Sequence, residues 1–147
     1  MLVGKVMSSP VIRATNATTV RAAAQQMRDH QVGALPVLHD NRSVGIVTDR
    51  DLVMRVIAAP GFVRGMETSV QEFMSPDVIT CFEDQQVTEA AALMGQLQVR
   101  RLLVLDRSGA PVGVLSVGDI AEHVSEELAG EVLGEISEAR ARDDAQG

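Results

Sequence analysis

Aromatic side chains are scarce in this chain of 147 residues: they make up 2% of it, as three Phe without Trp or Tyr. The platforms on which single-stranded nucleic acids stack are therefore largely missing. Positive charge is also short, because thirteen Lys and Arg oppose twenty Asp and Glu and give a formal net charge of -7. An acidic chain repels phosphate backbones, so we expect no general nucleic-acid binding. The composition does not exclude a local basic pocket that binds a small anion.

Cysteine occurs once, as Cys81, which excludes an internal disulfide and a thiolate-cluster metal site. The three histidines, His30, His39 and His123, are scattered along the chain, so we expect no metal site. No apolar run approaches the roughly 20 residues that span a bilayer, and the first seven residues are too short and broken for a signal peptide. We therefore expect a cytoplasmic protein without a membrane segment.

The core has to be aliphatic. Hydrophobic residues make up 46% of the chain, and with so few aromatic rings they are Val, Leu, Ile, Ala and the seven Met. A chain of this length buries about two-thirds of the surface of its unfolded state. The composition therefore predicts a globular protein that folds without a disulfide or a structural metal.

An internal repeat dominates the sequence and is the main indication of its fold. The stretch 44–52 (VGIVTDRDL) returns as 112–120 (VGVLSVGDI). Upstream of it, three features recur at an offset of 67 residues. They are Met7-Ser8 with Met74-Ser75, Val11-Ile12 with Val78-Ile79, and Val20, Ala23, Ala24 and Met27 with Val87, Ala90, Ala91 and Met94. The last set has the spacing i, i+3, i+4, i+7 and predicts one amphipathic helix in each copy.

Each copy predicts the order strand, helix, strand, strand, helix. Thr18 and Asp84 are the predicted N-caps of the first helices. Polar turns then separate two apolar segments in each copy, which predicts a pair of antiparallel hairpins. In the first copy, the first helix is followed by an apolar strand at 34–38 and later by a second helix at 51–59. In the second copy, the corresponding strand is 102–105 and the second helix is 119–128.

We therefore predict a mixed α/β (α+β) fold with a C-terminal extra helix. The predicted divisions are repeat 1 at 1–60, a linker at 61–69, repeat 2 at 70–128 and a helical tail at 129–147. In the tail, the residues 132–142 have helical spacing, and Glu138 and Arg142 are placed for an i, i+4 ion pair. We expect this helix to belong to neither repeat, and either to pack on a partner subunit or to fray.

The duplicated order and the motifs GIVTDRD at 45–51 and GVLSVGD at 113–119 resemble those of tandem CBS-domain proteins, a family named after cystathionine β-synthase. The resemblance covers residues from about 3 to 128. It implies two CBS repeats packed about a pseudo-twofold axis as a Bateman module, which often pairs with a second module as a disc-shaped dimer. In many members, clefts between the copies bind AMP, ADP, ATP, NAD or S-adenosylmethionine.

The runs 27–37 and 98–102 are similar to those of stand-alone bacterial two-repeat proteins. No enzyme domain, activated nucleophile, metal constellation or acid/base pair stands out, so we expect no catalysis and no required cofactor. The resemblance implies a non-catalytic sensor of adenosine nucleotides, forming a homodimer and acting on a separate, unidentified partner protein. The alternative is an interaction or stress-response protein of the same family that binds no nucleotide.

The candidate site lies where each repeated strand meets its second helix. By resemblance, Asp51 and Asp119 bind ribose, and Thr48 and Ser116 hydrogen-bond ribose or phosphate. A carboxylate can accept from two adjacent ribose hydroxyls, and free N–H groups at a helix start attract phosphate. The same residue types, three apart, are also the pattern of a capping box, which stabilises a helix by roughly 1 kcal/mol without a ligand. Both interpretations stay open.

Two basic residues distinguish the copies. Arg100 and Arg101 precede a strand of the second repeat, where basic side chains of nucleotide-binding relatives commonly reach phosphates. The first repeat has Gly33 and Ala34 at these places. We therefore expect two unequal clefts, of which at most one is well equipped for a charged phosphate. A solvated basic pair that balances an acidic chain is the alternative.

Further residues complete the candidate site. Arg50 lies in a first helical turn, where a cation is unfavourable unless the flanking carboxylates or a bound anion offset it. Gly45 and Gly113 interrupt a strand pattern, which indicates either a close backbone approach or a bulge. By resemblance, backbone groups near four further residues are expected to meet adenine. They are Ile12, Arg13, Ile79 and Thr80.

Overall fold

The structure is a computed structural model that describes residues 1–146, with side chains described as far as Glu138. The chain divides into two compact units. One unit is the segment Val11–Val78, and the other joins Met1–Pro10 to the chain from Ile79 onward. We call them the first and the second unit, because each contains most of the repeat of the same number.

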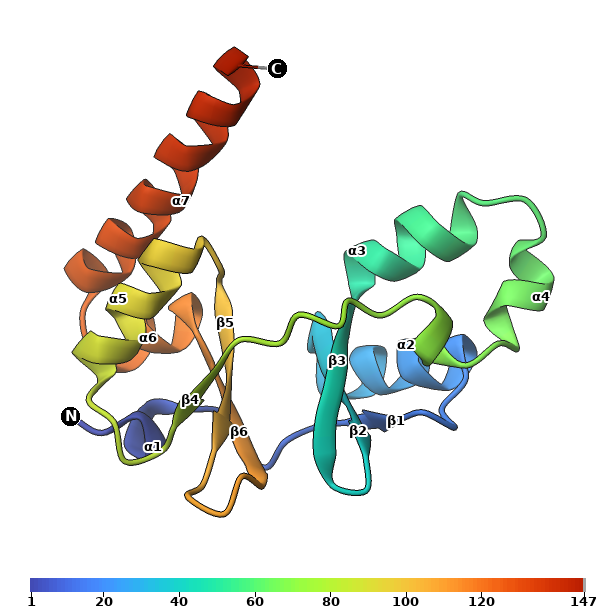
Figure 1. Cartoon of the computed structure of the whole chain (residues 1–147), viewed down its shortest axis with the longest axis horizontal. Coiled ribbons are helices and arrows are strands. Elements are labelled where there is room, and N and C mark those ends of the chain that lie inside the picture. The colour runs from blue at the N-terminus through green and yellow to red at the C-terminus, as the bar shows by residue number, and fades with distance from the viewer. Residues whose placement is uncertain (147) are drawn as a thin grey trace. The chain divides into compact units, whose positions relative to one another are not determined.

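The first unit is a three-stranded sheet with helices (Figure 1). Its elements are β1 (Ala14–Thr15), α2 (Val20–His30), β2 (Ala34–His39), β3 (Arg42–Thr48), α3 (Asp49–Asp51), the π-helix η1 (Leu52–Ile57), α4 (Phe62–Met66) and the 3₁₀-helix η2 (Val70–Glu72). The strand order is β1-β2-β3, in which β1 is parallel to β2 and the hairpin β2–β3 is antiparallel.

The second unit repeats this plan. Its elements are α1 (Val3–Val6), β4 (Thr80–Phe82), α5 (Val87–Leu97), β5 (Arg101–Leu105), β6 (Pro111–Ser116), α6 (Val117–His123) and α7 (Glu126–Gln146). The strand order is β4-β5-β6, with β4 parallel to β5 and β5 antiparallel to β6. The predicted order strand, helix, strand, strand, helix is thus confirmed in both copies, and so is the mixed α/β class.

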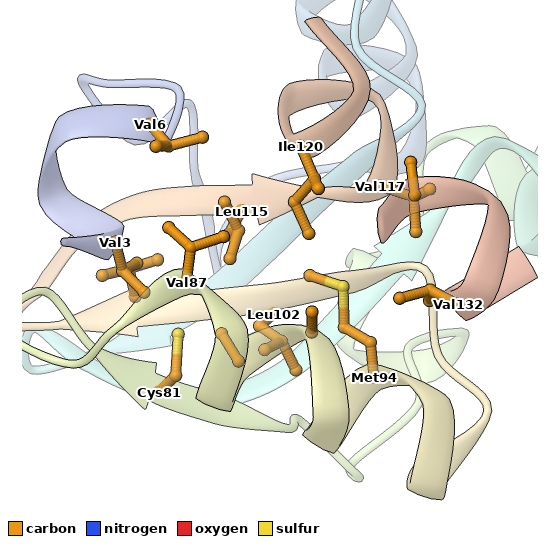
Figure 2. Packing of buried hydrophobic residues seen from close by; sticks show 14 of the residues in the cluster. Val3, Val6, Cys81, Val87, Met94, Leu102, Leu115, Val117, Ile120 and Val132 are labelled. Carbon is orange, nitrogen blue, oxygen red and sulfur yellow. The ribbon is translucent and has the colours of Figure 1, made fainter. Parts of the chain in front are cut away.

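Each unit buries one aliphatic cluster. In the second unit, side chains from the strands β4, β5 and β6 and the helices α1, α5, α6 and α7 meet in a single core (Figure 2). Its labelled members are Val3, Val6, Cys81, Val87, Met94, Leu102, Leu115, Val117, Ile120 and Val132. The first unit has its own cluster, which includes Val20, Ala23 and Met27 of the predicted helical stripe. Ala24 of that stripe is exposed, whereas its counterpart Ala91 is buried.

Each unit is closed by a segment that precedes the other repeat in the sequence. The N-terminal segment joins the second unit, where the Val3 N–H donates to the Gln85 carbonyl at 2.9 Å and Ser8 pairs with Val114 of β6. The segment around η2 joins the first unit in the same manner, because Ser75 pairs with Ile46 of β3. Residues 1–10 and 70–78 are therefore part of the packing of the repeats and not spacers.

The predicted helix ends need correction. The N-cap of α2 is Thr19, whose hydroxyl accepts from the Ala22 N–H at 3.1 Å, and α5 begins after Gln86 without a side-chain cap. Thr18 and Asp84 are thus wrong as N-caps. Thr18 instead accepts from the Thr15 N–H in the preceding turn, and the Asp84 carboxylate forms an ion pair with Arg107.

The C-terminal helix also differs from the prediction. The helix expected at 119–128 ends at His123, and α7 starts at Glu126 and continues past Ile136. Ala129, Val132 and Ile136 are buried in the core of the second unit. This part of α7 is therefore packed on its own chain, and does not fray or need a partner subunit to cover it. The expected Glu138–Arg142 pair lies outside the described side chains. Within residues 1–146, no helix combines the length and the apolar character needed to cross a membrane.

Candidate functional site

The first joint is the point where β3 passes into α3. The Asp51 N–H donates to the Thr48 hydroxyl at 3.1 Å, and the Thr48 N–H donates to Asp51 Oδ2 at 2.9 Å. These two bonds complete a capping box. Both residues are partly buried, and the box satisfies N–H groups that would otherwise be free at the helix start. The helix thus begins here without a ligand.

The second joint, where β6 passes into α6, has the same geometry. The Asp119 N–H donates to the Ser116 hydroxyl and the Ser116 N–H donates to Asp119 Oδ2, both at 3.0 Å. The capping-box interpretation of the repeated motif is therefore confirmed at both joints. It leaves one oxygen of each carboxylate, Oδ1, for other contacts.

The two remaining carboxylate oxygens have different neighbours. Asp119 Oδ1 accepts a hydrogen bond from the Ser8 hydroxyl at 3.0 Å. Asp51 Oδ1 lies 3.8 Å from Arg55 Nε, which is an ion-pair distance but too long for a hydrogen bond. The Arg55 guanidinium also donates to the Phe73 carbonyl at 3.2 Å, which holds it beside the carboxylate. Neither Ser8 nor Arg55 was predicted from the sequence; the i, i+4 spacing could have indicated Arg55.

Gly45 and Gly113 are explained by close approach of the chain to itself. An ideal Cβ at Gly45 would lie 2.8 Å from the Ser75 carbonyl oxygen, and one at Gly113 would lie 2.9 Å from that of Ser8. The thioether of Met74 also lies against Gly45, and that of Met7 lies against Gly113. A bulge sits beside each glycine, between Val37 and Leu38 and between Val104 and Leu105 of the partner strands. Both predicted reasons for a glycine thus apply, and neither needs a ligand.

Arg100 and Arg101 lie at the second joint. The Arg100 carbonyl accepts from the Val117 N–H at 3.0 Å, and Arg101 stands opposite Ser116 in the β5–β6 ladder. Both side chains are exposed. The corresponding contacts of the first joint are made by Gly33, whose carbonyl accepts from the Asp49 N–H at 2.9 Å, and by Ala34 opposite Thr48. The same backbone arrangement therefore presents two guanidinium groups at one joint and no side-chain charge from these positions at the other.

Ile79 and Thr80 lie at the same edge of their sheet as this arginine pair. The Ile79 carbonyl accepts from the Leu103 N–H at 3.0 Å, and Thr80 pairs with Leu103 in parallel β4 and β5. Because parallel strands start at one edge, the structure brings Ile79 close to Arg101 and to the end of β6. The second unit therefore gathers most of its predicted site residues at one sheet edge.

The first unit gathers fewer of them. Ile12 packs against the core. The Arg13 side chain donates to Asn41 Oδ1 at 3.0 Å in the β2–β3 turn, at the end of the hairpin away from Thr48. It lines a pocket of about 400 Å³ there. Arg50 is exposed on the first turn of α3, and its N–H donates to the Asp49 carboxylate at 2.8 Å.

The described residues offer little catalytic chemistry. The Cys81 thiol is buried, and desolvation raises its pKa to about 11, so it stays protonated at neutral pH. Among residues whose side chains are described, no group of three or more His, Cys, Asp or Glu is placed to hold a metal ion. The carboxylates of the two joints are already hydrogen-bonded to their own backbone.

Comparison with known proteins identifies the family to which this architecture belongs. The family model of the CBS domain matches twice, at residues 3–58 and 70–126. The CBS domain-containing protein YhcV of Bacillus subtilis is 35% identical over 132 residues, which cover 89% of this chain and 91% of that protein. Hypoxic response protein 1 of Mycobacterium tuberculosis is 34% identical over 112 residues, 74% of each chain.

Solved structures agree with these matches. The CBS domain pair of protein MJ0100, crystallised in complex with 5'-methylthioadenosine and S-adenosyl-L-methionine, is 27% identical and superimposes with a TM-score of 0.71. The superposition covers 83% of this chain and 94% of that one. Two matched repeats, relatives of similar length and this common fold show that the chain belongs to the CBS-domain family, as a tandem of two CBS repeats.

Proposed function

We propose that the protein is a non-catalytic sensor of an adenosine nucleotide and that it regulates a separate partner protein. The observation that carries this proposal is the sheet edge of the second unit, where Arg100 and Arg101 lie with Ser116 and Asp119. A guanidinium offers forked donors to phosphate, and a carboxylate accepts from ribose hydroxyls. The adenosine ligands in the related MJ0100 domain pair support the same ligand class.

The chemistry of the described residues supports a regulatory rather than a catalytic role in this proposal. The one thiol is protonated, and the carboxylates at the joints serve as helix caps. A ligand can then act only through its different affinity for two states of the protein, which shifts their populations. No cofactor is required in this mechanism, because AMP, ADP, ATP, NAD or S-adenosylmethionine would each be a regulatory ligand.

Thermal unfolding with each of these five ligands tests the proposal. A ligand at about 100 times its Kd adds roughly 2.7 kcal/mol of stability. For a chain of this size, that corresponds to a rise in Tm of about 5–10 °C. Guanosine and cytidine monophosphate serve as matched controls and should leave Tm unchanged. If none of the five adenosine ligands moves Tm at millimolar concentration, the sensor proposal is wrong.

The alternative function is that of an interaction or stress-response protein that binds no nucleotide. Both capping boxes are complete without a ligand, and a relative with 34% identity carries the name hypoxic response protein. Asp51→Ala and Asp119→Ala separate the two functions. Under the alternative, each variant loses about 1 kcal/mol of stability and nothing else. Under the sensor proposal, nucleotide affinity falls as well.

We also propose that the partner in solution includes a second copy of the chain, bound through an apolar surface on η1 and α4. Its members are 48–65% exposed and are Val53, Met54, Ile57, Phe62 and Val63. At the matching positions, the second repeat has Ala121, Glu122 and Ser125 in place of the first three, so the repeat does not require this surface.

Charge favours self-association through this surface. Residues 49–67 carry three arginines and three carboxylates and are therefore neutral, although the whole chain has a charge of -7. Two acidic chains repel each other least where their surfaces are neutral. Apolar patches of a few hundred Å² on a soluble protein are typical of interaction sites, and a twofold contact buries the same patch on both copies.

Light scattering coupled to size-exclusion chromatography tests the dimer. We expect twice the chain mass for the wild type and the single mass for Met54→Glu. Leu133→Glu is the matched control, because Leu133 is also a partly exposed apolar residue, on α7, and should leave the dimer intact. A monomeric wild type at tens of micromolar, or a dimeric Met54→Glu, would contradict this interface.

A further inference from the structure

Two serines occupy equivalent places in the two units. The Ser8 N–H donates to the Val114 carbonyl at 2.9 Å and the Ser8 carbonyl accepts from the Val114 N–H at 3.0 Å. Ser75 exchanges the same two bonds with Ile46, both at 2.9 Å. The offset of 67 residues between the serines is the offset of the repeat. On the backbone, the two contacts are therefore copies of each other.

The side chains of these serines are not used alike. The Ser8 hydroxyl donates to Asp119 Oδ1 at 3.0 Å. The corresponding oxygen of the first joint, Asp51 Oδ1, has the Arg55 guanidinium at 3.8 Å as its ion-pair neighbour. Asp119 thus has both carboxylate oxygens in hydrogen bonds of its own chain, since Oδ2 accepts from the Ser116 N–H. Asp51 has one of its two oxygens in such a bond.

We propose that Ser8 competes with a ligand hydroxyl for Asp119 and so lowers the ligand affinity of the second joint. This inference rests on the proposed nucleotide binding. A vicinal diol binds a carboxylate best by donating to both oxygens, and at Asp119 the Ser8 hydroxyl already occupies one of the acceptor positions of Oδ1 and draws on its charge, so a ribose hydroxyl has to compete with it there. At Asp51, no hydrogen bond occupies the same oxygen, which has only the longer ion-pair contact with Arg55.

The competitor is held in place by the fold. Val3 and Val6 of the same N-terminal segment are buried in the core of the second unit. The Met7 side chain and the Ser8 carbonyl lie against Gly113. The Ser8 hydroxyl is therefore presented to Asp119 at no further cost in chain entropy, which strengthens an internal competitor relative to a free ligand. A ligand hydroxyl that binds Oδ1 of Asp119 then weakens a contact of residues 1–10.

Ser8→Ala and its matched control Ser75→Ala test this competition. Isothermal titration with AMP and with adenosine gives the affinity for the wild type and for both variants. We expect Ser8→Ala to bind about three- to tenfold more tightly, since a hydrogen bond no longer competes with the ribose for Oδ1 of Asp119. Ser75→Ala should stay within about twofold of the wild type. Ser8→Gly removes the same hydroxyl and should reproduce the gain.

The dependence on Asp119 gives a second readout. In an Asp119→Asn background, Ser8→Ala should no longer raise the affinity, because the charged acceptor for which Ser8 competes is gone. Binding by the wild type that Ser8→Ala leaves unchanged or weakens would overturn the competition and leave the proposed function standing. If AMP and adenosine bind none of these proteins at millimolar concentration, the proposed function and this inference both fail. Binding by Ser8→Ala alone would support the competition in its strongest form.

Discussion

Replacing Gly45 or Gly113 by alanine should destabilise the protein in the absence of any ligand. The new Cβ would lie 2.8 Å from the Ser75 carbonyl oxygen in one case and 2.9 Å from the Ser8 carbonyl oxygen in the other. Neither oxygen is free to move, because each accepts a strand hydrogen bond of 2.9–3.0 Å. Relieving the clash by a few tenths of an ångström lengthens that bond and displaces the Met side chain that covers the glycine.

The magnitude follows from these contacts. One extra methyl group in a packed site costs about 1–3 kcal/mol, and a weakened hydrogen bond adds up to about 1 kcal/mol. We therefore expect a loss of about 2 kcal/mol for each variant, or roughly 4–8 °C in Tm. Urea denaturation followed by circular dichroism gives the free energy of unfolding directly. The measurement is made on protein freed of any bound nucleotide.

Glycines on α7 provide controls of opposite sign. A Cβ at Gly130 or Gly134 meets no atom within 4 Å. Alanine in a helix interior is favoured over glycine by about 0.5–1 kcal/mol, so Gly130→Ala and Gly134→Ala should stabilise the chain. If Gly45→Ala and Gly113→Ala keep wild-type stability but lose nucleotide affinity, the space at these glycines serves a ligand and the packing explanation is refuted.

Three further predictions concern other parts of the second unit. The Arg107 guanidinium donates to Asp84 and lowers the pKa of that carboxyl. Their interaction should therefore stabilise the fold above about pH 4 and be lost as the pH falls through the lowered pKa of the folded state. Acid unfolding of Asp84→Asn beside the wild type measures the difference. Cys81 should react with a thiol reagent at pH 8 only at the rate of unfolding, because it is buried and its pKa is about 11; fast labelling would contradict this. Ile136→Ala should cost about 2–4 kcal/mol by denaturation, whereas Leu133→Ala, at a partly exposed position on the same helix, should cost less than about 1 kcal/mol; equal losses would show that α7 is not docked as described.

The fold could be predicted from the sequence because the same pattern of residues occurs twice in the chain. A hydrophobic stripe at i, i+3, i+4, i+7 is ambiguous in a single copy, but the same stripe at an offset of 67 residues, followed by the same hairpin pattern, leaves few alternatives. The capping boxes could be predicted too, since Thr48 with Asp51 and Ser116 with Asp119 are local contacts that depend only on residues three apart.

Contacts between distant segments could not be predicted in this way. Ser8 and Asp119 are 111 residues apart, and no spacing rule relates them. The pairing of the N-terminal segment with β6 depends on the completed sheet and on the gap at Gly113. Similarly, α7 starts at Glu126 because the chain leaves α6 after His123 and turns back onto α5, which a helical pattern beginning at Val132 does not reveal. Local sequence fixes where helices can start; packing decides where they do.

Because the two caps are identical, any functional difference between the joints has to come from the residues around them. A ligand at Asp51 could use Oδ1 while the capping bond to Oδ2 stays intact, so it would meet only the 3.8 Å ion pair with Arg55 and break no hydrogen bond of the chain. A ligand at Asp119 has to compete with the Ser8 hydroxyl for Oδ1. Only a ligand that binds two states with different affinity can shift their populations, and breaking an internal contact is one source of such a difference. On the proposed function, Ser8 thus lowers the affinity that the arginine pair gives the second joint, and the second joint is the one whose occupancy the N-terminal segment can report.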